Sequence, residues 1–257
     1  MSRGAAPRIA FQGRACAAFG AAALGACTAG PLDAIALGPN SLADGLLAHY
    51  TFDEGSGSTV VDHSGNDRDG TLTGGTWIPD GEFGGALRLS GSDYVTVANF
   101  PNMLSSLSVS AWVRTSSMPT DGYETVVSTE IVFQGGWQLN LDKTTSDTAV
   151  HEAFWDTVRG TYTYYECPCM PLGQWAHLAM VVDDDAKTLT MYVNGQVESV
   201  TPAPNPMTPG STVLYIGRWS MQDRLLVGDV DDIAIYNRAL SSVEVQALGR
   251  MPPPDPM

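Results

Sequence analysis

The sequence is poor in positive charge and in charged residues altogether. Its 257 residues include 13 lysines and arginines against 28 aspartates and glutamates, and charged residues make up 16% of the chain. The formal charge of −15 would repel the phosphate backbone of a nucleic acid, which argues against nucleic-acid binding. A hydrophobic share of 44% is enough for a sizeable core, so disorder throughout the chain is excluded.

Long hydrophobic runs are scarce, and the run near the start, residues 15–24, is too short for a permanent membrane span. It is rich in alanine and follows three arginines in a stretch without acidic residues, a pattern that predicts a signal peptide over residues 1–26. The run ends in the letters LGAC, which resemble the lipobox of bacterial lipoproteins and imply lipidation of Cys27. We therefore expect an outer-membrane or cell-surface lipoprotein, with a secreted or periplasmic protein as the alternative.

Cysteine is scarce as well, with four in the chain. Cys16 would leave with the signal peptide and Cys27 would carry the lipid. Cys167 and Cys169 remain, separated by one proline, and in an oxidising compartment they have few partners other than each other. A strained loop disulfide is therefore one interpretation, and a redox or metal-binding role stays open.

Signals for long helices are few, whereas 27 glycines and 16 prolines punctuate the chain. Between them lie short apolar or alternating segments that predict about a dozen strands and favour an antiparallel sandwich. These segments are 47–52, 86–89, 94–97, 107–114, 125–129, 137–141, 152–155, 162–166, 175–182, 188–193, 213–218 and 231–236.

Three further local patterns complete the organisation of the chain. Asn194 and Gly195 follow a β-rich run and predict a tight hairpin turn. Residues 241–248 predict one short helix, capped by Ser241 and ending before Gly249. We expect a tether over residues 27–44, one domain over 45–250 and a proline-rich tail over 251–257.

Eight short segments occur in one order: YTFDEGSG at 50–57, DHSGN at 62–66 with DGTL at 69–72, FGGAL at 83–87, SVSAWV at 108–113, WAHLA at 175–179, YVNG at 192–195, IGR at 216–218 and DDIAIYNRAL at 231–240. Together they resemble the laminin G-like, concanavalin A-like jelly-roll domains of exported bacterial proteins. The resemblance covers about residues 45–250. It implies an all-β fold, a two-sheet antiparallel jelly-roll sandwich, and often a non-catalytic recognition role.

Acidic residues on glycine-rich loops suggest calcium, which prefers hard oxygen ligands. The loop from Asp62 is not an EF-hand, because its glycine is misplaced and Thr73 stands where the closing glutamate would be. Related jelly-roll domains often hold one structural calcium between an early acidic loop and the last strand. That resemblance implies a site gathered from Asp53, Asp62, Asn66 and Asp231 or Asp232. The alternative is that these residues serve turn geometry.

Carbohydrate recognition needs aromatic faces surrounded by a few fixed polar groups. Aromatic residues are densest over residues 151–165, and the candidates are Trp155, Tyr162 and Tyr164, with Trp137 and Trp219 as further members of a platform. Tyr123 and Glu124 are alternative positions on its rim. Burial in the core is the competing explanation for each aromatic residue.

Catalytic signatures are missing. The chain contains neither the Glu-x-Asp-x-x-Glu strand of laminarinase-like hydrolases, nor the Gln-Ile-His element of jelly-roll alginate lyases, nor a Gly-x-Ser-x-Gly elbow. We therefore expect a non-catalytic cell-surface module that binds a glycan or a surface protein and holds a structural calcium. A structural or adhesion protein without sugar affinity is the first alternative. A glycoside hydrolase or polysaccharide lyase with an unrecognised site is the second.

Overall fold

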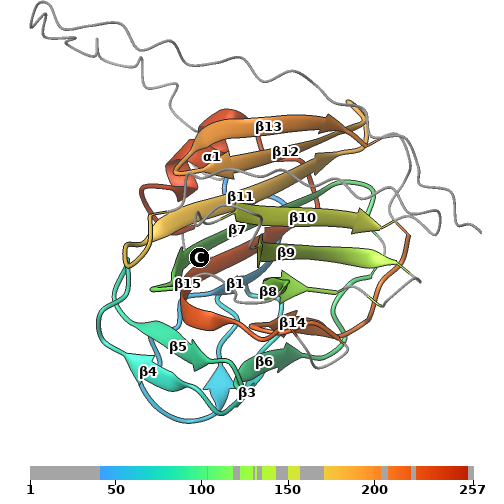
Figure 1. Ribbon diagram of the computed structural model, residues 1–257. Coiled ribbons are helices and arrows are strands. Elements are labelled where there is room, and N and C mark those ends of the chain that lie inside the picture. The colour runs from blue at the N-terminus through green and yellow to red at the C-terminus, as the bar shows by residue number, and fades with distance from the viewer. Residues whose placement is uncertain are drawn as a thin grey trace, which may run out of the picture. The chain divides into compact units, whose positions relative to one another are not determined.

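The protein is built from two antiparallel β-sheets and one short helix, as the computed structural model shows (Figure 1). The structure describes residues 41–102, 104–117, 122–129, 131, 135–142, 150–156, 171–203, 208–220 and 224–253, with residues 142 and 150–156 described by their backbone. All of these residues belong to one compact unit of the chain, Ala36–Met257. Among them, no helix is long and apolar enough to cross a membrane.

The eight-stranded sheet contains both the longest strands and the helix-covered face. Its order is β13 (Gln196–Pro202), β12 (Thr188–Val193), β11 (Ala176–Asp183), β7 (Leu107–Arg114), β15 (Val227–Tyr236), β5 (Ala86–Ser90) and β4 (Thr76–Ile78), and β1 (Leu46–Tyr50) also pairs with β15. The seven-stranded sheet runs β10 (Val150–Asp156), β9 (Gly136–Asp142), β8 (Tyr123–Ser128), β14 (Leu214–Ile216), β6 (Tyr94–Val97), β3 (Gly70–Thr73) and β2 (Thr59–Val60).

The main core lies between the two sheets, because alternate residues of each strand point to the same side. Trp137, Leu139 and Leu141 of β9 are fully buried there, as are Val95 and Val97 of β6. The largest buried side chains of the core also include Tyr50, Phe52 and Phe100. Burial of each such side chain contributes about 1.5–3 kcal/mol, so this layer supplies most of the stability of the fold.

A second, smaller apolar cluster covers the outer face of the eight-stranded sheet. Helix α1 (Ser242–Leu248) places Val245 and Leu248 against residues of the central strands. The strand residues of this cluster are Leu46, Ala179, Val181, Tyr192, Ala234 and Tyr236. As a result β7 and β11, which run through the middle of the sheet, are buried on both faces.

The sequence predictions of the fold class and of two local elements are confirmed. The chain is an all-β, two-sheet sandwich with one short C-terminal helix. Ser241 caps α1 and forms a capping box with Glu244. Asn194 and Gly195 have φ angles of 49° and 73°, as a tight turn between β12 and β13 requires. The short strands β2, β3 and β4 were not predicted, and β13 was not among the predicted strands although the turn before it was. The predicted strand 162–166 lies outside the described residues.

Candidate binding site

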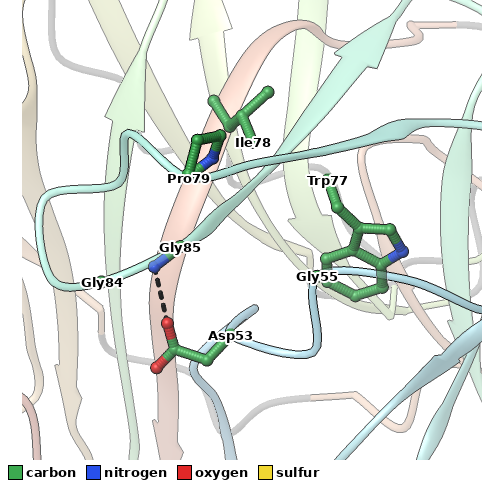
Figure 2. Close-up of a pocket in the computed structure, with 7 residues that line it drawn as sticks. All are labelled: Asp53, Gly55, Trp77, Ile78, Pro79, Gly84 and Gly85. Atoms are coloured by element: carbon green, nitrogen blue, oxygen red, sulfur yellow. Dashed lines mark hydrogen bonds between the residues drawn. The ribbon is translucent and has the colours of Figure 1, made fainter.

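An open pocket lies at the β4 edge of the eight-stranded sheet (Figure 2). Its volume is about 390 Å³, within the range of small-molecule sites. Seven residues line it: Asp53, Gly55, Trp77, Ile78, Pro79, Gly84 and Gly85. Figure 2 shows the indole ring of Trp77 and the carboxylate of Asp53 on two sides of the pocket, with Ile78 and Pro79 on a third.

Trp77 forms an aromatic wall whose orientation is fixed. It lies on β4, opposite Leu87 of β5, and packs in part against the main core. Its indole Nε1–H donates to the carbonyl oxygen of Gly57 at 3.0 Å, which ties the ring to the segment that follows β1. The side chain is half-buried, so one part of the ring is anchored while another borders the pocket.

The opposite wall is the loop of residues 79–85, which is held at several points. The Gly85 N–H donates to Asp53 Oδ1 at 2.6 Å, and the Phe83 N–H donates to Asp231 Oδ2 at 2.9 Å. Gly84 has a φ of 73°, and a Cβ at this position would collide with the Asp53 carboxylate. Only glycine fits there, because the position combines left-handed backbone with close approach of a side chain.

Asp53 therefore has two roles in the pocket. One of its oxygens clamps Gly85, whereas Oδ2 has no hydrogen-bond partner among the described residues. The residue is exposed, so this oxygen is available to a ligand hydroxyl. The indole face, the free carboxylate oxygen and the glycine-lined surface form a combination suited to a sugar ring, which presents both C–H faces and hydroxyl groups.

Behind the pocket, Asp231 and Asp232 are buried in β15. Asp231 Oδ1 accepts the N–H of Asp232 at 2.8 Å, and Asp232 Oδ1 lies 2.9 Å from Nε2 of His49. Burial raises the pKa of Asp231 to about 7. Burial also raises the pKa of Asp232, while the hydrogen bond with His49 lowers it. These two carboxyls connect the pocket loop and β1 to the centre of the sheet.

Asp62 and Asn66, the other two predicted calcium ligands, organise the loop after β2. Asp62 Oδ1 accepts the N–H groups of His49 and Ser64, and Oδ2 accepts those of Arg68 and the Ser64 hydroxyl, at 2.9–3.0 Å. Asn66 Nδ2 donates to the carbonyl oxygens of Leu46 and Leu47. Both side chains thus bind the loop to β1.

These contacts do not fit a calcium cage, in which the same oxygens would have to face the ion. In the part of the chain that the structure describes, no group of three or more His, Cys, Asp or Glu side chains could hold a metal ion. Calcium binding stays a prediction from the sequence. The observed role of Asp53, Asp62 and Asp231 is to accept backbone N–H groups, as the alternative based on turn geometry expected.

The structure describes the side chains of two of the five residues predicted for the aromatic platform, Trp137 and Trp219. Trp137 is 1% exposed and belongs to the core between the sheets, so it presents no face to a ligand, and its prediction as a platform residue is corrected. Trp219 is 8% exposed and lies against the guanidinium of Arg224. The Trp155 side chain, Tyr162, Tyr164, and the cysteines Cys27, Cys167 and Cys169 lie outside the described residues.

Trp77 was missed by the sequence analysis. The signal was available, since Gly74 and Gly75 precede the short strand and Pro79 follows it, a pattern typical of an edge strand between turns. The sequence offered no way to place Trp77 opposite Asp53, because the two residues are brought together by different strands.

Comparisons with known proteins agree with this architecture. Residues 89–246 match the laminin G-type model of the concanavalin A-like lectin/glucanases superfamily. None of the curated protein sequences matches the chain significantly. Among solved structures, domain 4 of AbnA, a GH43 extracellular arabinanase from Geobacillus stearothermophilus in complex with arabinotriose, is similar with a TM-score of 0.61 and 24% identity, over 80% of this chain and 98% of that chain.

Two toxin domains are similar as well. The binding domain of Paraclostridial Mosquitocidal Protein 1 has a TM-score of 0.59 at 18% identity, and the botulinum neurotoxin serotype G binding domain has 0.54 at 17%. The matches cover 81% and 79% of this chain, but only 52% and 50% of the toxin chains. At these identities the likeness to solved structures shows the fold. The family match covers more than half of the sequence, and the chain therefore belongs to the concanavalin A-like lectin/glucanases superfamily.

Proposed function

We propose that this protein is a non-catalytic recognition module that binds carbohydrate in the Trp77 pocket. The observation that carries the proposal is the combination of an anchored indole ring with a free carboxylate oxygen of Asp53 around one open pocket. A sugar ring can stack its C–H face on the indole while its hydroxyl groups donate to the carboxylate. The backbone clamps on the loop fix the wall before a ligand arrives, which lowers the entropic cost of binding.

The family supports this proposal without fixing the ligand. The arabinanase domain that resembles this chain was solved in complex with arabinotriose, and the two toxin domains are the binding domains of their toxins. Binding of another molecule is thus a role found on this fold, although fold likeness does not transfer a ligand from one protein to another.

We propose that the pocket does not turn over its ligand. Glycoside hydrolysis generally uses two carboxyl groups that flank the scissile bond. Asp53 is the one acidic residue among those that line the pocket. We therefore expect no release of reducing ends when the protein is incubated with the polysaccharides it binds. Release that disappears on Asp53→Asn substitution would contradict this part of the proposal.

Binding is tested first with arabinotriose and then with a broad glycan array, using titration calorimetry to measure the dissociation constant of each hit. Trp77→Ala should weaken binding about tenfold, the effect of losing one aromatic contact of about 1.4 kcal/mol. Trp77→Phe should retain most of the affinity, because it keeps a ring. Asp53→Asn keeps an oxygen that can accept the Gly85 N–H, so it tests the charge of the carboxylate while preserving the loop.

A matched control is Leu172→Ala, which removes an exposed apolar side chain that does not line the pocket. Its affinity should equal that of the wild type. Melting curves of all variants separate loss of binding from loss of folding. A folded wild-type protein that binds no glycan would overturn the proposal and favour a protein-binding or structural role.

We further propose that the protein is exported and attached to a membrane through lipid on Cys27. The support is the sequence pattern of residues 1–27, which lies outside the described residues. Labelling with a radioactive fatty acid in a bacterial host should mark the wild type and not Cys27→Ser. Equal absence of label in both, with cleavage of the signal, would favour plain secretion.

A further inference from the structure

A second open pocket, separate from the Trp77 pocket, has a charged row of side chains across the eight-stranded sheet. Its volume is about 560 Å³, and among the described residues the two pockets share none in their linings. Arg88, Asp229 and Arg114 line it from β5, β15 and β7, three neighbouring strands (Figure 1). Asp229 stands opposite Arg88 on one side and opposite Arg114 on the other.

The charged row lies on the outer face of the sheet. The residues next to it along the three strands, Leu87, Val230 and Val113, are buried between the two sheets, so the row itself points outward. None of the described residues that line this pocket belongs to the apolar cluster under helix α1. The outer face is thus divided into an apolar part that the helix covers and a charged part that is open.

Asp229 holds both guanidinium groups in place. Its side chain is 6% exposed, and its two oxygens accept Nε–H and Nη2–H of Arg88 at 2.7 and 3.0 Å. Its Oδ2 also accepts Nε–H of Arg114 at 2.9 Å. The guanidinium carbon of Arg114 lies 4.6 Å from the ring centre of Trp175, which fixes it from a second side. Both cations are therefore oriented before any ligand binds, which lowers the entropic cost of binding.

Arg88 and Asp80 keep groups that can bind a ligand. A guanidinium has five N–H donors, of which Arg88 uses two on Asp229. Its Nη1 has no partner among the described residues, and the side chain is 53% exposed. Asp80 Oδ2 accepts from Nη1 of Arg114 at 2.9 Å, whereas its Oδ1 has no partner in the described part of the chain. The pocket thus offers a cationic donor and an anionic acceptor to the same ligand.

The charge balance of the pocket favours a zwitterion. Its described lining contains two arginines and two aspartates. A ligand with net negative charge would be repelled by a chain of formal charge −15, and a ligand with net positive charge would lie beside two guanidiniums. An α-amino acid has one carboxylate, which matches the guanidinium fork, and one ammonium, which matches a carboxylate oxygen.

We propose that this pocket binds a free amino acid with an apolar side chain. Arg88 pairs with the carboxylate through Nη1, and Asp80 pairs with the ammonium through Oδ1. Val227 lines the pocket and is 40% exposed, so it gives the apolar side chain a surface to contact. The inference goes beyond the proposed function, since it assigns a different pocket and a different class of ligand. The competing explanation is an ion-pair network that only joins the strands, and it predicts no binding.

Calorimetry on the full chain with excess ligand, at constant ionic strength, compares L-leucine with two of its derivatives. N-acetyl-L-leucine lacks the ammonium, and L-leucine amide lacks the carboxylate. We expect leucine to bind about ten times more tightly than either derivative, because each derivative loses one charge-assisted hydrogen bond. Glycine, which has no side chain, should bind severalfold more weakly than leucine.

Two substitutions assign the roles within the pocket. Arg88→Gln should weaken leucine binding about tenfold, since it removes the carboxylate partner while Arg114 still pairs with Asp229. Asp80→Asn keeps an oxygen that can accept from Arg114. It should weaken leucine binding without changing the affinity for N-acetyl-leucine, which has no ammonium. A role in holding the pocket together would weaken both ligands equally.

Lys187→Gln and Asp185→Asn are the matched controls, since they remove the same charges from exposed side chains on the turn between β11 and β12. Each should change the leucine affinity less than about twofold. Trp77→Ala should leave leucine binding intact. A folded protein that binds a glycan through Trp77 but binds no leucine would overturn this inference and leave the proposed function standing.

Three further results would also overturn the inference. One is equal affinity for leucine and leucine amide in the wild type, a comparison that needs no variant to fold. Another is an unchanged leucine affinity in Arg88→Gln, with melting curves showing that the variant is folded. The third is tighter binding of phosphoethanolamine than of leucine, which would assign the pocket to a zwitterion that carries phosphate.

Discussion

The two outer faces of the sandwich use their side chains in opposite ways. On the eight-stranded sheet, helix α1 and the strands beneath it form an apolar cluster, and Arg238 joins strand to helix through Glu244 at 2.7 Å. On the seven-stranded sheet, the corresponding face carries arginines stacked on aromatic rings and several buried side-chain polar atoms without a hydrogen-bond partner. One face therefore contributes stability through apolar packing, whereas the other retains buried polar groups that cost stability.

The largest expected effect comes from breaking the covered face. The Val245 side chain of α1 is fully buried against the sheet. Val245→Asp would therefore place an unpaired charge in the apolar cluster. We expect a loss of about 3 kcal/mol or more in the free energy of unfolding, measured by urea denaturation. Val243→Asp is the control on the same helix, because this half-buried position lies in the first turn, where a negative charge is favourable. Equal losses in the two variants would show that α1 is not held by this cluster.

The contribution of Asp231, beside the pocket, to the free energy of unfolding should depend on pH. Burial raises the folded-state pKa of Asp231 to about 7, from 3.8 for the free group. Between these values the folded state binds more protons than the unfolded state, so stability falls as pH rises. Asp231→Asn removes this effect, and its stability relative to the wild type should improve by about 2 kcal/mol between pH 5 and 6.5. Melting curves over that range measure it, and a difference independent of pH would contradict the raised pKa.

His177, on the helix-covered face, provides a control because its effect on the pH dependence of stability has the opposite sign. It lies 2.8 Å from Ser110 Oγ, and burial lowers its pKa to about 4, from 6.5. The unfolded state binds more protons between these values, so this residue makes stability fall as pH decreases. His177→Gln should therefore lose stability relative to the wild type as pH rises from 4 to 6.5, the reverse of the trend for Asp231→Asn.

A smaller effect should come from the same substitution at two asparagines, one without hydrogen-bond partners on the seven-stranded sheet and one that binds the loop after β2 to β1. Asn140→Leu removes two buried polar atoms that have no partner, and we expect a gain of about 1 kcal/mol in stability. Asn66→Leu removes hydrogen bonds to Leu46 and Leu47 and should lose about 1 kcal/mol. Chemical denaturation of both variants provides the measurement. Destabilisation by Asn140→Leu would mean that the amide is satisfied within the protein.

Calcium should have the smallest effect. Because Asp62 and Asp231 already accept backbone N–H groups, we expect a chelator to change the melting temperature by less than about 2 °C, which corresponds to under about 1 kcal/mol. A larger fall that disappears in Asp62→Asn or Asp231→Asn would instead establish the structural calcium that the sequence predicted.

Local chemistry accounts for what could be predicted from the sequence. The turn at Asn194 and Gly195 and the capping box of Ser241 and Glu244 depend on residues within a few positions of each other. Alternation within strands such as residues 94–97 likewise depends on neighbours. The order of the eight segments that resemble the jelly-roll family then predicted the two-sheet sandwich. The strands β2, β3 and β4 were missed because two to four residues carry too little periodic signal.

The candidate sites depend on contacts between distant segments, and these only the tertiary structure decided. Asp53 and Asp231 are acidic residues on loops and strand ends in the sequence, but in the fold each accepts an N–H from the pocket loop. Trp137 and Trp219 are the same residue type, yet the first lies in the core and the second supports Arg224, because strand register and loop path decide burial. The sequence thus determined the elements and their order through short-range propensities. The pairing of strands determined which side chains meet, and with that the lining of the Trp77 pocket.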